Sequence, residues 1–207
     1  MSHYFENDDS LPKDRKEISF RFLGTVYNFE TMAGVFSKND LDYGTRAMLK
    51  AVFAEGVSGK VLDLGTGFGP VGVLTKLTFP DVQMTMSDVN ERACTLAKEN
   101  ALRYRADVTV TVSDGFSNLP DIFDVILLNP PIRAGKQVIY RLFEESRQHL
   151  GYEGILWIVM RKDQGALSAE KKLREFFEKV DLSAKDKGYR VIKCSNPVQK
   201  EPQNNSI

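Results

Sequence analysis

The segment VLDLGTGFG, residues 61–69, decides the fold class of this chain of 207 residues. Residues 60–64 have the short apolar pattern that is typical of a buried strand. Glycines follow at alternate positions, and glycine lets a backbone turn sharply and approach a ligand closely. A helical pattern begins directly afterwards at Pro70. The segment therefore predicts a strand, a ligand-binding turn and a helix, in that order.

Strand and helix patterns alternate after this segment. The predicted strands cover residues 60–64, 82–87, 108–112, 124–128, 154–160, 182–184 and 189–194, and the predicted helices cover residues 70–77, 90–105, 135–150 and 166–180. Asn90 is the expected N-cap of the second helix. Such alternation indicates a mainly parallel, doubly wound α/β sheet. Because the last two strands are joined by only a few residues, we expect the last strand to run antiparallel.

The residues before the segment predict an addition to this sheet. Apolar residues alternate with polar ones from Ile18 to Phe22, a turn follows, and the pattern resumes at Val26, which indicates a β-hairpin. Residues 41–53 have helical spacing. We expect a flexible arm over residues 1–16, a single domain over residues 17–198, and a polar tail over residues 199–207. The domain comprises a hairpin-and-helix cap, residues 17–58, and a core, residues 59–198.

The composition excludes several classes of protein. The chain has 28 Lys and Arg against 28 Asp and Glu, a balance that argues against nonspecific coating of nucleic acid. The longest apolar run, residues 155–160, is far shorter than the roughly 20 residues of a membrane helix. The N-terminus is polar and acidic, unlike a secretory signal. With two cysteines and two histidines, a Cys/His metal site is disfavoured. We expect a cytoplasmic protein without a metal or a membrane anchor.

Three aspartates stand at the ends of successive predicted strands. Asp63 precedes the glycines and suits a ligand with a positively charged amino group. Asp88, 21 residues after Gly67, can accept hydrogen bonds from a ribose, and Asp114 can reach an adenine edge. The glycine spacing is G-x-G-x-G, which fits a nicotinamide dehydrogenase poorly. The alternative is a structural glycine turn in which Asp88 and Asp114 are ordinary helix caps.

The fourth predicted strand ends in Asn129-Pro130-Pro131-Ile132. The two prolines fix φ and make this loop rigid. The Asn129 oxygen and the Pro130 carbonyl could each accept one N–H of a planar amino group, which would hold that nitrogen toward an electrophile. The alternative is a common Asn-Pro turn that ends a strand. Its place beside the predicted ligand site favours the functional interpretation.

These motifs together resemble class I S-adenosylmethionine-dependent methyltransferases that modify exocyclic or amide nitrogens. Four longer segments, GVFSKNDLDYGT, NPPIRAGK, DQGALS and GYRVIKCS, beginning at residues 34, 129, 163 and 188, resemble the RsmC-like ribosomal RNA methyltransferases. Those enzymes methylate guanine N2 in small-subunit (16S) ribosomal RNA. The resemblance covers residues 15–198 and implies the Rossmann-like class I methyltransferase fold. It also implies S-adenosyl-L-methionine as cofactor, ribosomal RNA or the small ribosomal subunit as partner, and a monomer or homodimer.

The motifs and the resemblance together give three sets of expected site residues. The expected catalytic residues are Asn129, Pro130, Pro131 and Ile132. The expected cofactor-binding residues are Asp63, Gly65, Gly67, Gly69, Asp88, Val89, Asp114, Gly115, Asn129, Asp42 and Thr45, the last two because the resembling segment contains them. The expected substrate-binding residues are Phe36, Arg133, Lys136 and Arg161. Gly65 and Gly67 would line the methionine portion of the cofactor, with Asp63 near its amino group.

The substrate face departs from the family at one position. Many nitrogen methyltransferases carry Tyr or Phe after Asn-Pro-Pro, where the ring stacks on the target base, and here the residue is Ile132. Phe36 could supply the ring. Arg133 and Lys136 would hold a phosphate near the target, whereas Arg141 and Arg147 are interpreted as a solvated helix face.

Three other functions remain open from the sequence. A protein-glutamine N5-methyltransferase could hold a side-chain amide with the same loop. A DNA or transfer-RNA amino-methyltransferase would use the same chemistry. The third alternative is a noncatalytic assembly factor that binds S-adenosylmethionine or RNA and transfers no methyl group. For the enzymes, we expect in-line methyl transfer in which positioning supplies most of the catalysis.

Overall fold

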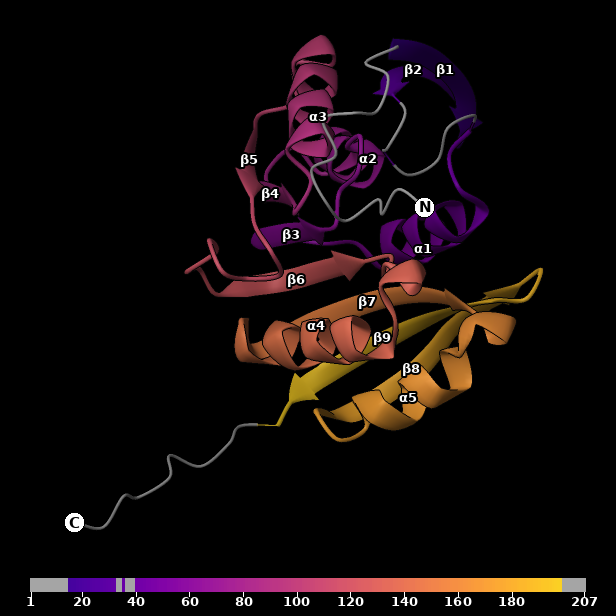
Figure 1. Ribbon diagram of the computed structural model, residues 1–207, viewed down its shortest axis with the longest axis vertical. Coiled ribbons are helices and arrows are strands. Elements are labelled where there is room, and N and C mark those ends of the chain that lie inside the picture. The colour runs from indigo at the N-terminus through magenta and orange to yellow at the C-terminus, as the bar shows by residue number, and fades with distance from the viewer. Residues whose placement is uncertain (1–14, 33–34, 36–39, 199–207) are drawn as a thin grey trace.

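A computed structural model describes residues 15–32, 35 and 40–198 of the chain (Figure 1). Its central sheet has seven strands in the order β5-β4-β3-β6-β7-β9-β8. They are β3 (Lys60–Leu64), β4 (Gln83–Asp88), β5 (Val108–Val112), β6 (Phe123–Leu128), β7 (Leu150–Arg161), β8 (Phe177–Asp186) and β9 (Tyr189–Pro197). Strand β9 runs antiparallel to both neighbours, and all other neighbouring pairs are parallel. The predicted sheet is confirmed.

Helices cover both faces of the sheet. Helices α1 (Tyr43–Glu55), α2 (Pro70–Thr78) and α3 (Glu91–Arg103) share one apolar core, and α4 (Lys136–Gln148) and α5 (Ala166–Leu173) share the other (Figure 1). In β3, Val61 packs toward α1–α3 while Leu62 and Leu64 pack toward α4 and α5. This alternation explains the continuous apolar pattern of strands buried on both faces. In the described ranges, no helix is long and apolar enough to cross a membrane.

The N-terminal hairpin is part of the first core. Strands β1 (Arg15–Phe22) and β2 (Thr25–Met32) are joined by a two-residue turn, and Phe20 and Phe29 are buried with α2 and α3. Arg15 forms an ion pair with Glu99 of α3 at 2.6 Å. This ion pair holds Arg15, which belongs to the segment predicted as a flexible arm, against α3.

The C-terminal part differs most from the predicted elements. The helix predicted over residues 166–180 ends at Leu173, and β8 begins at Phe177. Phe177 and Val180 have helical spacing from Leu173, but both are buried in the second core as strand residues. Pairing with β9 along the whole of β8 therefore overrides the local helical pattern. Two short 3-10 turns precede the last two helices. The turn η1 (Ile132–Ala134) lies before α4, and η2 (Lys162–Gln164) lies before α5.

The strand order brings the predicted motifs to one edge of the sheet. Strands β4 and β5 extend from one side of β3, whereas β6 and β7 extend from the other. The direction of winding thus changes between β3 and β6, and the loops after these strands diverge at the carboxyl edge. In α/β sheets that position is where ligands bind.

Close packing of α2 on β4 requires glycine at position 72. A Cβ at Gly72 would lie 2.4 Å from Cγ of Met86. We expect Gly72→Ala to destabilise the fold by about 1–2 kcal/mol, because overpacking outweighs the roughly 1 kcal/mol gain in helix propensity. Urea denaturation measures this loss. Gly151→Ala is the control, since a Cβ there meets nothing nearer than 3.8 Å. Equal stabilities of the two variants would contradict the packing argument.

Candidate functional site

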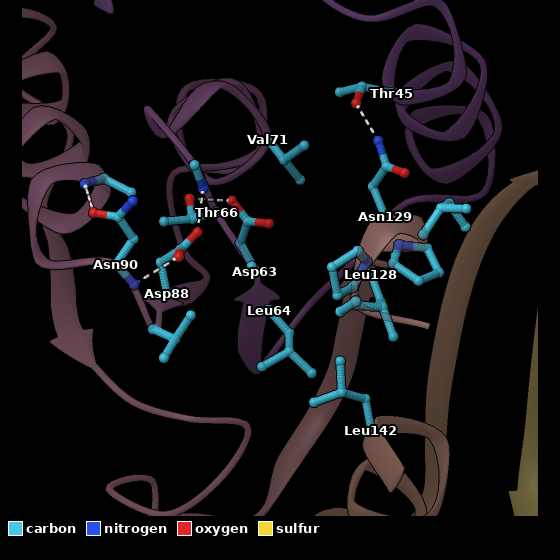
Figure 2. Close-up of a pocket in the computed structure, with 18 of the residues that line it drawn as sticks. Thr45, Asp63, Leu64, Thr66, Val71, Asp88, Asn90, Leu128, Asn129 and Leu142 are labelled. Carbon is cyan, nitrogen blue, oxygen red and sulfur yellow. Dashed lines mark hydrogen bonds between the residues drawn. The ribbon is translucent and has the colours of Figure 1, made fainter. Parts of the chain in front are cut away.

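A cavity of about 680 Å³ opens at the carboxyl edge of the sheet. The loops after β3, β4, β5 and β6 and the N-terminus of α1 line it. Figure 2 shows Asp63, Thr66 and Asp88 on one side of the cavity, and Asn129 with Thr45 on the other. Leu64, Leu128 and Leu142 lie between or below these groups. The cavity therefore joins the glycine-rich segment to the Asn-Pro-Pro segment.

Asp63 holds the glycine-rich turn against α2. Its side chain points toward α2, and Oδ2 accepts hydrogen bonds from Thr66 Oγ1 at 2.5 Å and from the Gly72 amide at 2.9 Å. The other oxygen, Oδ1, makes no hydrogen bond to a described residue. Burial raises the pKa of Asp63 from 3.8 to about 7, although the two hydrogen bonds lower it. This carboxylate thus lacks a compensating positive charge.

Asp88 connects the loops after β3 and β4. Its Oδ2 accepts from the Gly67 amide and its Oδ1 from the Asn90 amide, both at 2.9 Å. Burial raises the pKa of Asp88, and these backbone hydrogen bonds lower it. Gly67 has φ of +58°, a conformation that side chains strain to adopt, and a Cβ there would point into open space. The turn therefore presents bare backbone beside one buried carboxylate, Asp63, and one half-buried carboxylate, Asp88.

Asp114 forms an ion pair with Arg141 of α4, and Arg141 also contacts Glu145. Arg141 lines the cavity. Arg147 is 8% exposed and donates from Nη1 to the Val198 carbonyl at 2.8 Å. The interpretation as a solvated helix face holds for Arg141, which is exposed although it also lines the cavity. It is wrong for Arg147, which α4 buries beside the chain segment that follows β9.

The Asn129 side chain is held by the N-terminus of α1. Its Nδ2 lies 3.2 Å from Asp42 Oδ2 and 3.1 Å from Thr45 Oγ1. Asp42 is the N-cap of α1 and also accepts from the Thr45 amide at 2.9 Å. Within the described part of the chain, Asn129 Oδ1 has no hydrogen-bond partner. The residues expected near the cofactor, Asp42 and Thr45, therefore contact the expected catalytic residue.

The structure brings most of the predicted site residues to the cavity wall. Those that line it are Asp42, Thr45, Asp63, Gly65, Gly67, Asp88, Val89, Asp114, Gly115, Asn129, Pro130, Pro131, Ile132 and Arg133. Gly69 lies outside the lining and packs on α3, where a Cβ would lie 2.9 Å from Ala97 Cα. Lys136 begins α4 and Arg161 ends β7, both outside the lining. Phe36 lies outside the described residues.

Sequence reasoning missed Tyr189 as a lining residue. It follows the two-residue turn between β8 and β9, and its Oη lies 3.5 Å from Asp42 Oδ1. Arg161 lies over its ring, with Cζ 5.6 Å from the centroid, and pairs with Asp163. Burial and Asp42 raise the pKa of Tyr189. The GYRVIKCS segment contained this residue, but no spacing rule linked it to the cavity.

Among residues 15–32, 35 and 40–198, no three His, Cys, Asp or Glu side chains group as metal ligands. The cavity instead combines a buried and a half-buried carboxylate, Asp63 and Asp88, with bare backbone and an oriented carboxamide. The carboxylates can hold a ligand that carries an amino cation and hydroxyl groups. The carboxamide oxygen can accept a hydrogen bond from an N–H group of a second ligand.

Residues 26–193 match the protein family described as methyltransferase small domain. The chain is 42% identical over 195 residues to uncharacterized protein YbxB of Bacillus subtilis (strain 168), with 93% of this chain and 97% of that protein aligned. It is 32% identical over 176 residues to ribosomal RNA small subunit methyltransferase C of Haemophilus influenzae (strain PittGG), with 83% and 51% aligned. The chain thus spans about half the length of that methyltransferase.

Two solved structures have a similar fold. The 16S rRNA N2 G1207 methyltransferase (RsmC) of T. thermophilus, in complex with AdoMet and guanosine, matches with a TM-score of 0.80 and 23% identity, over 89% of this chain and 51% of that one. The ribosomal protein L11 methylase of Lactobacillus delbrueckii subsp. bulgaricus matches with a TM-score of 0.65 and 20% identity, over 76% and 83%.

Proposed function

The chain belongs to the methyltransferase small domain family, and from this premise we propose that it methylates guanine N2 in small-subunit ribosomal RNA with S-adenosylmethionine. The observation that carries the proposal is the orientation of Asn129, whose Nδ2 is held by Asp42 and Thr45 while Oδ1 has no partner among the described residues. An acceptor fixed in this way suits a donating amino group. Two relatives support RNA as the substrate, because their names describe ribosomal RNA methyltransferases.

The residues present fit S-adenosylmethionine in size and charge. A cavity of about 680 Å³ lies within the range that small-molecule sites occupy. Asp63 Oδ1 would accept from the amino group of the methionine portion, and Asp88 from the ribose. Asp114 would accept a hydrogen bond from the adenine edge. The backbone at Gly65 and Gly67 would line the methionine portion of the cofactor. The amino group thereby supplies the positive charge that the buried carboxylate of Asp63 lacks.

The reaction then depends on positioning. The cofactor supplies a methyl group on a sulfonium, which is already activated for transfer. Asn129 Oδ1 and the Pro130 carbonyl would each accept one N–H of the target amine, directing the nitrogen lone pair toward the cofactor half of the cavity. As the N–C bond forms, the bond between the methyl carbon and sulfur would break and leave a neutral thioether. The amine becomes acidic only at that stage, so its proton can pass to water and a dedicated base is not required. A base in a duplex would have to be extruded, and Ile132 offers it an aliphatic contact.

The proposal is tested by transfer of radiolabelled methyl groups from S-adenosylmethionine. The acceptors are small ribosomal subunits, naked ribosomal RNA and total protein, each followed by digestion of the product. Label in N2-methylguanosine supports the proposal. Three other outcomes would overturn it. Label in protein glutamine would indicate the amide methyltransferase, and label in another nucleoside would indicate a different nucleic-acid methyltransferase. No label in any acceptor, despite cofactor binding, would indicate the noncatalytic function.

Arg133 and Lys136 are proposed to contact RNA phosphates beside the cavity. Both side chains are exposed on the segment that follows Asn-Pro-Pro. For the double variant Arg133→Ala/Lys136→Ala, we expect weaker RNA binding and a slope of log affinity against log salt reduced by about 1.4–1.8, since each phosphate contact contributes about 0.7–0.9. Fluorescence anisotropy at several salt concentrations measures it.

The matched control for this pair is Lys50→Ala/Lys98→Ala. These lysines are exposed on α1 and α3 and do not line the cavity. The control removes the same formal charge and should leave the salt slope near that of the wild type. If both double variants reduced the slope equally, the effect would be one of net charge and the phosphate contact would be refuted.

A further inference from the structure

We infer that Asp42 is a positioning residue whose negative charge acts through the Asn129 carboxamide to favour methyl transfer. This inference rests on the proposed function. The contact that carries it joins the N-cap of α1 to a side chain 87 residues later, across the mouth of the cavity. A helix cap requires only the Thr45 amide at 2.9 Å, so the additional hydrogen bond from Asn129 at 3.2 Å needs another explanation.

The contact fixes which way the carboxamide faces. An ionised carboxylate only accepts hydrogen bonds, so the side of Asn129 that faces Asp42 must carry the N–H groups. Thr45 Oγ1, 3.1 Å from Asn129 Nδ2, accepts from it and donates to Asp42 Oδ2 at 3.3 Å. Both partners therefore turn Asn129 Oδ1 to the position where an amino group can donate.

The charge of Asp42 also makes that oxygen a better acceptor. A hydrogen bond from an amide N–H to a carboxylate polarises the amide, so its carbonyl oxygen becomes more negative. The target nitrogen gains positive charge while its bond to the methyl carbon forms, and a more negative Oδ1 stabilises that charge. Asp42 forms no ion pair with the described residues, so none of them neutralises it. Asp42 is itself half-buried and its neighbour Thr45 is buried, so solvent screens this charge less than it would screen one on the open surface.

The substitution Asp42→Asn separates the charge from the geometry. Asparagine is as good an N-cap as aspartate, and its Oδ1 can accept from the Thr45 amide and from Asn129 as Asp42 Oδ2 does. Its Nδ2 would then face Tyr189 Oη, which can accept. We expect kcat to fall about tenfold, because a hydrogen bond to a charged group is about twice as strong as a neutral one. KM for S-adenosylmethionine and the unfolding midpoint should stay within error of the wild type.

Three further variants sharpen this test. Asp40→Asn makes the same change two residues earlier, at a side chain that is 63% exposed and paired with Arg46, and should leave kcat unchanged. Thr45→Ser keeps the hydroxyl and should retain activity, whereas Thr45→Val removes it and should lower kcat. If Asp42→Asn kept the wild-type kcat, or raised KM for the cofactor without lowering kcat, the inference would be overturned. In the second case, Asp42 would be a cofactor ligand.

A measurement without turnover separates this inference from the proposed function. The side-chain amide protons of Asn129 are identified in ¹⁵N NMR spectra as the pair of signals lost in Asn129→Ala. In Asp42→Asn they should move upfield as the charged acceptor is removed, while Asp40→Asn should leave them in place. Unmoved signals in Asp42→Asn would overturn the contact. A wild type that methylates no RNA would instead defeat the proposed function, whatever the spectra show.

Discussion

Replacing Asn129 by alanine should lower kcat for methyl transfer to RNA by about 10²–10³-fold, the usual loss when one oriented polar group is removed from a reaction centre. The target amine would keep the Pro130 carbonyl as acceptor but lose the second point that fixes its direction. The affinity for S-adenosylmethionine should change less than twofold, since Asp63 and Asp88 lie on the other side of the cavity (Figure 2). Single-turnover kinetics and calorimetric binding measure the two quantities separately.

Two companion variants define what this loss means. Asn28→Ala is the control, because Asn28 is exposed on β2 and contacts Ser19 instead of the cavity. Asn129→Asp keeps an acceptor oxygen but places a second carboxylate where Nδ2 now lies 3.2 Å from Asp42 Oδ2. Repulsion should turn that side chain away and lower kcat as well. A rate for Asn129→Ala within tenfold of the wild type would refute the assigned role.

For Asp63→Asn, the dissociation constant of S-adenosylmethionine should rise by about 10- to 100-fold, the range expected for losing a hydrogen bond to a charged group. The asparagine oxygen can still accept from Thr66 and from the Gly72 amide, so the turn should persist. What is lost is the negative charge opposite the amino group. Isothermal titration calorimetry measures the change, and Asp121→Asn, at an exposed side chain paired with Lys60, is the control.

Because the pKa of Asp63 is raised, protein stability and cofactor affinity should change with pH in opposite directions. With its pKa raised from 3.8 to about 7, the folded protein binds a proton that the unfolded chain has released. The stability of the cofactor-free wild type should therefore fall as pH rises from about 4 to 7. Cofactor affinity should increase as pH rises through about 7, because the ionised form binds the amino group. Asp63→Asn should weaken the stability trend, to which the raised pKa of Asp88 also contributes, and should abolish the trend in affinity. A wild-type affinity that is flat between pH 6 and 8 would contradict the assignment.

The fold was predictable because its decisive signals are local. Strands β3, β6 and β7 contain apolar runs that are typical of buried strands, and Asn90 caps α3 as its sequence position predicts. The end of α5 was not predictable, because Phe177 and Val180 fit a helix as well as a strand. Pairing with β9 decides between these structures, and the spacing of residues within one segment carries no information on such pairing.

The site was predictable at the strand ends and not across the cavity. Asp63 and Asp88 lie at the ends of β3 and β4, and Asn129 follows β6. The topology places these three strands side by side, so the proximity of the residues follows from the sheet. The contact of Asp42 with Asn129 and the place of Tyr189 depend on how α1 and the β8–β9 turn dock. Gly44 allows that docking, since a Cβ there would lie 2.7 Å from the Tyr189 ring. A glycine within a helical pattern indicates that something packs closely against the helix. The sequence does not show that Tyr189 is the residue that does so.

The two cysteines of the chain are both buried, Cys94 beneath Asp88 and Cys194 in the second core. Burial raises the pKa of Cys94 to about 11 and that of Cys194 further, so neither is a thiolate at neutral pH. Because both thiols are buried and protonated, we expect the folded protein to react slowly with maleimides and mild oxidants. A single cysteine introduced at an exposed position beside Arg133 and Lys136 would then be the most reactive thiol. It would give one attachment point for a fluorophore or spin label that reports the approach of RNA.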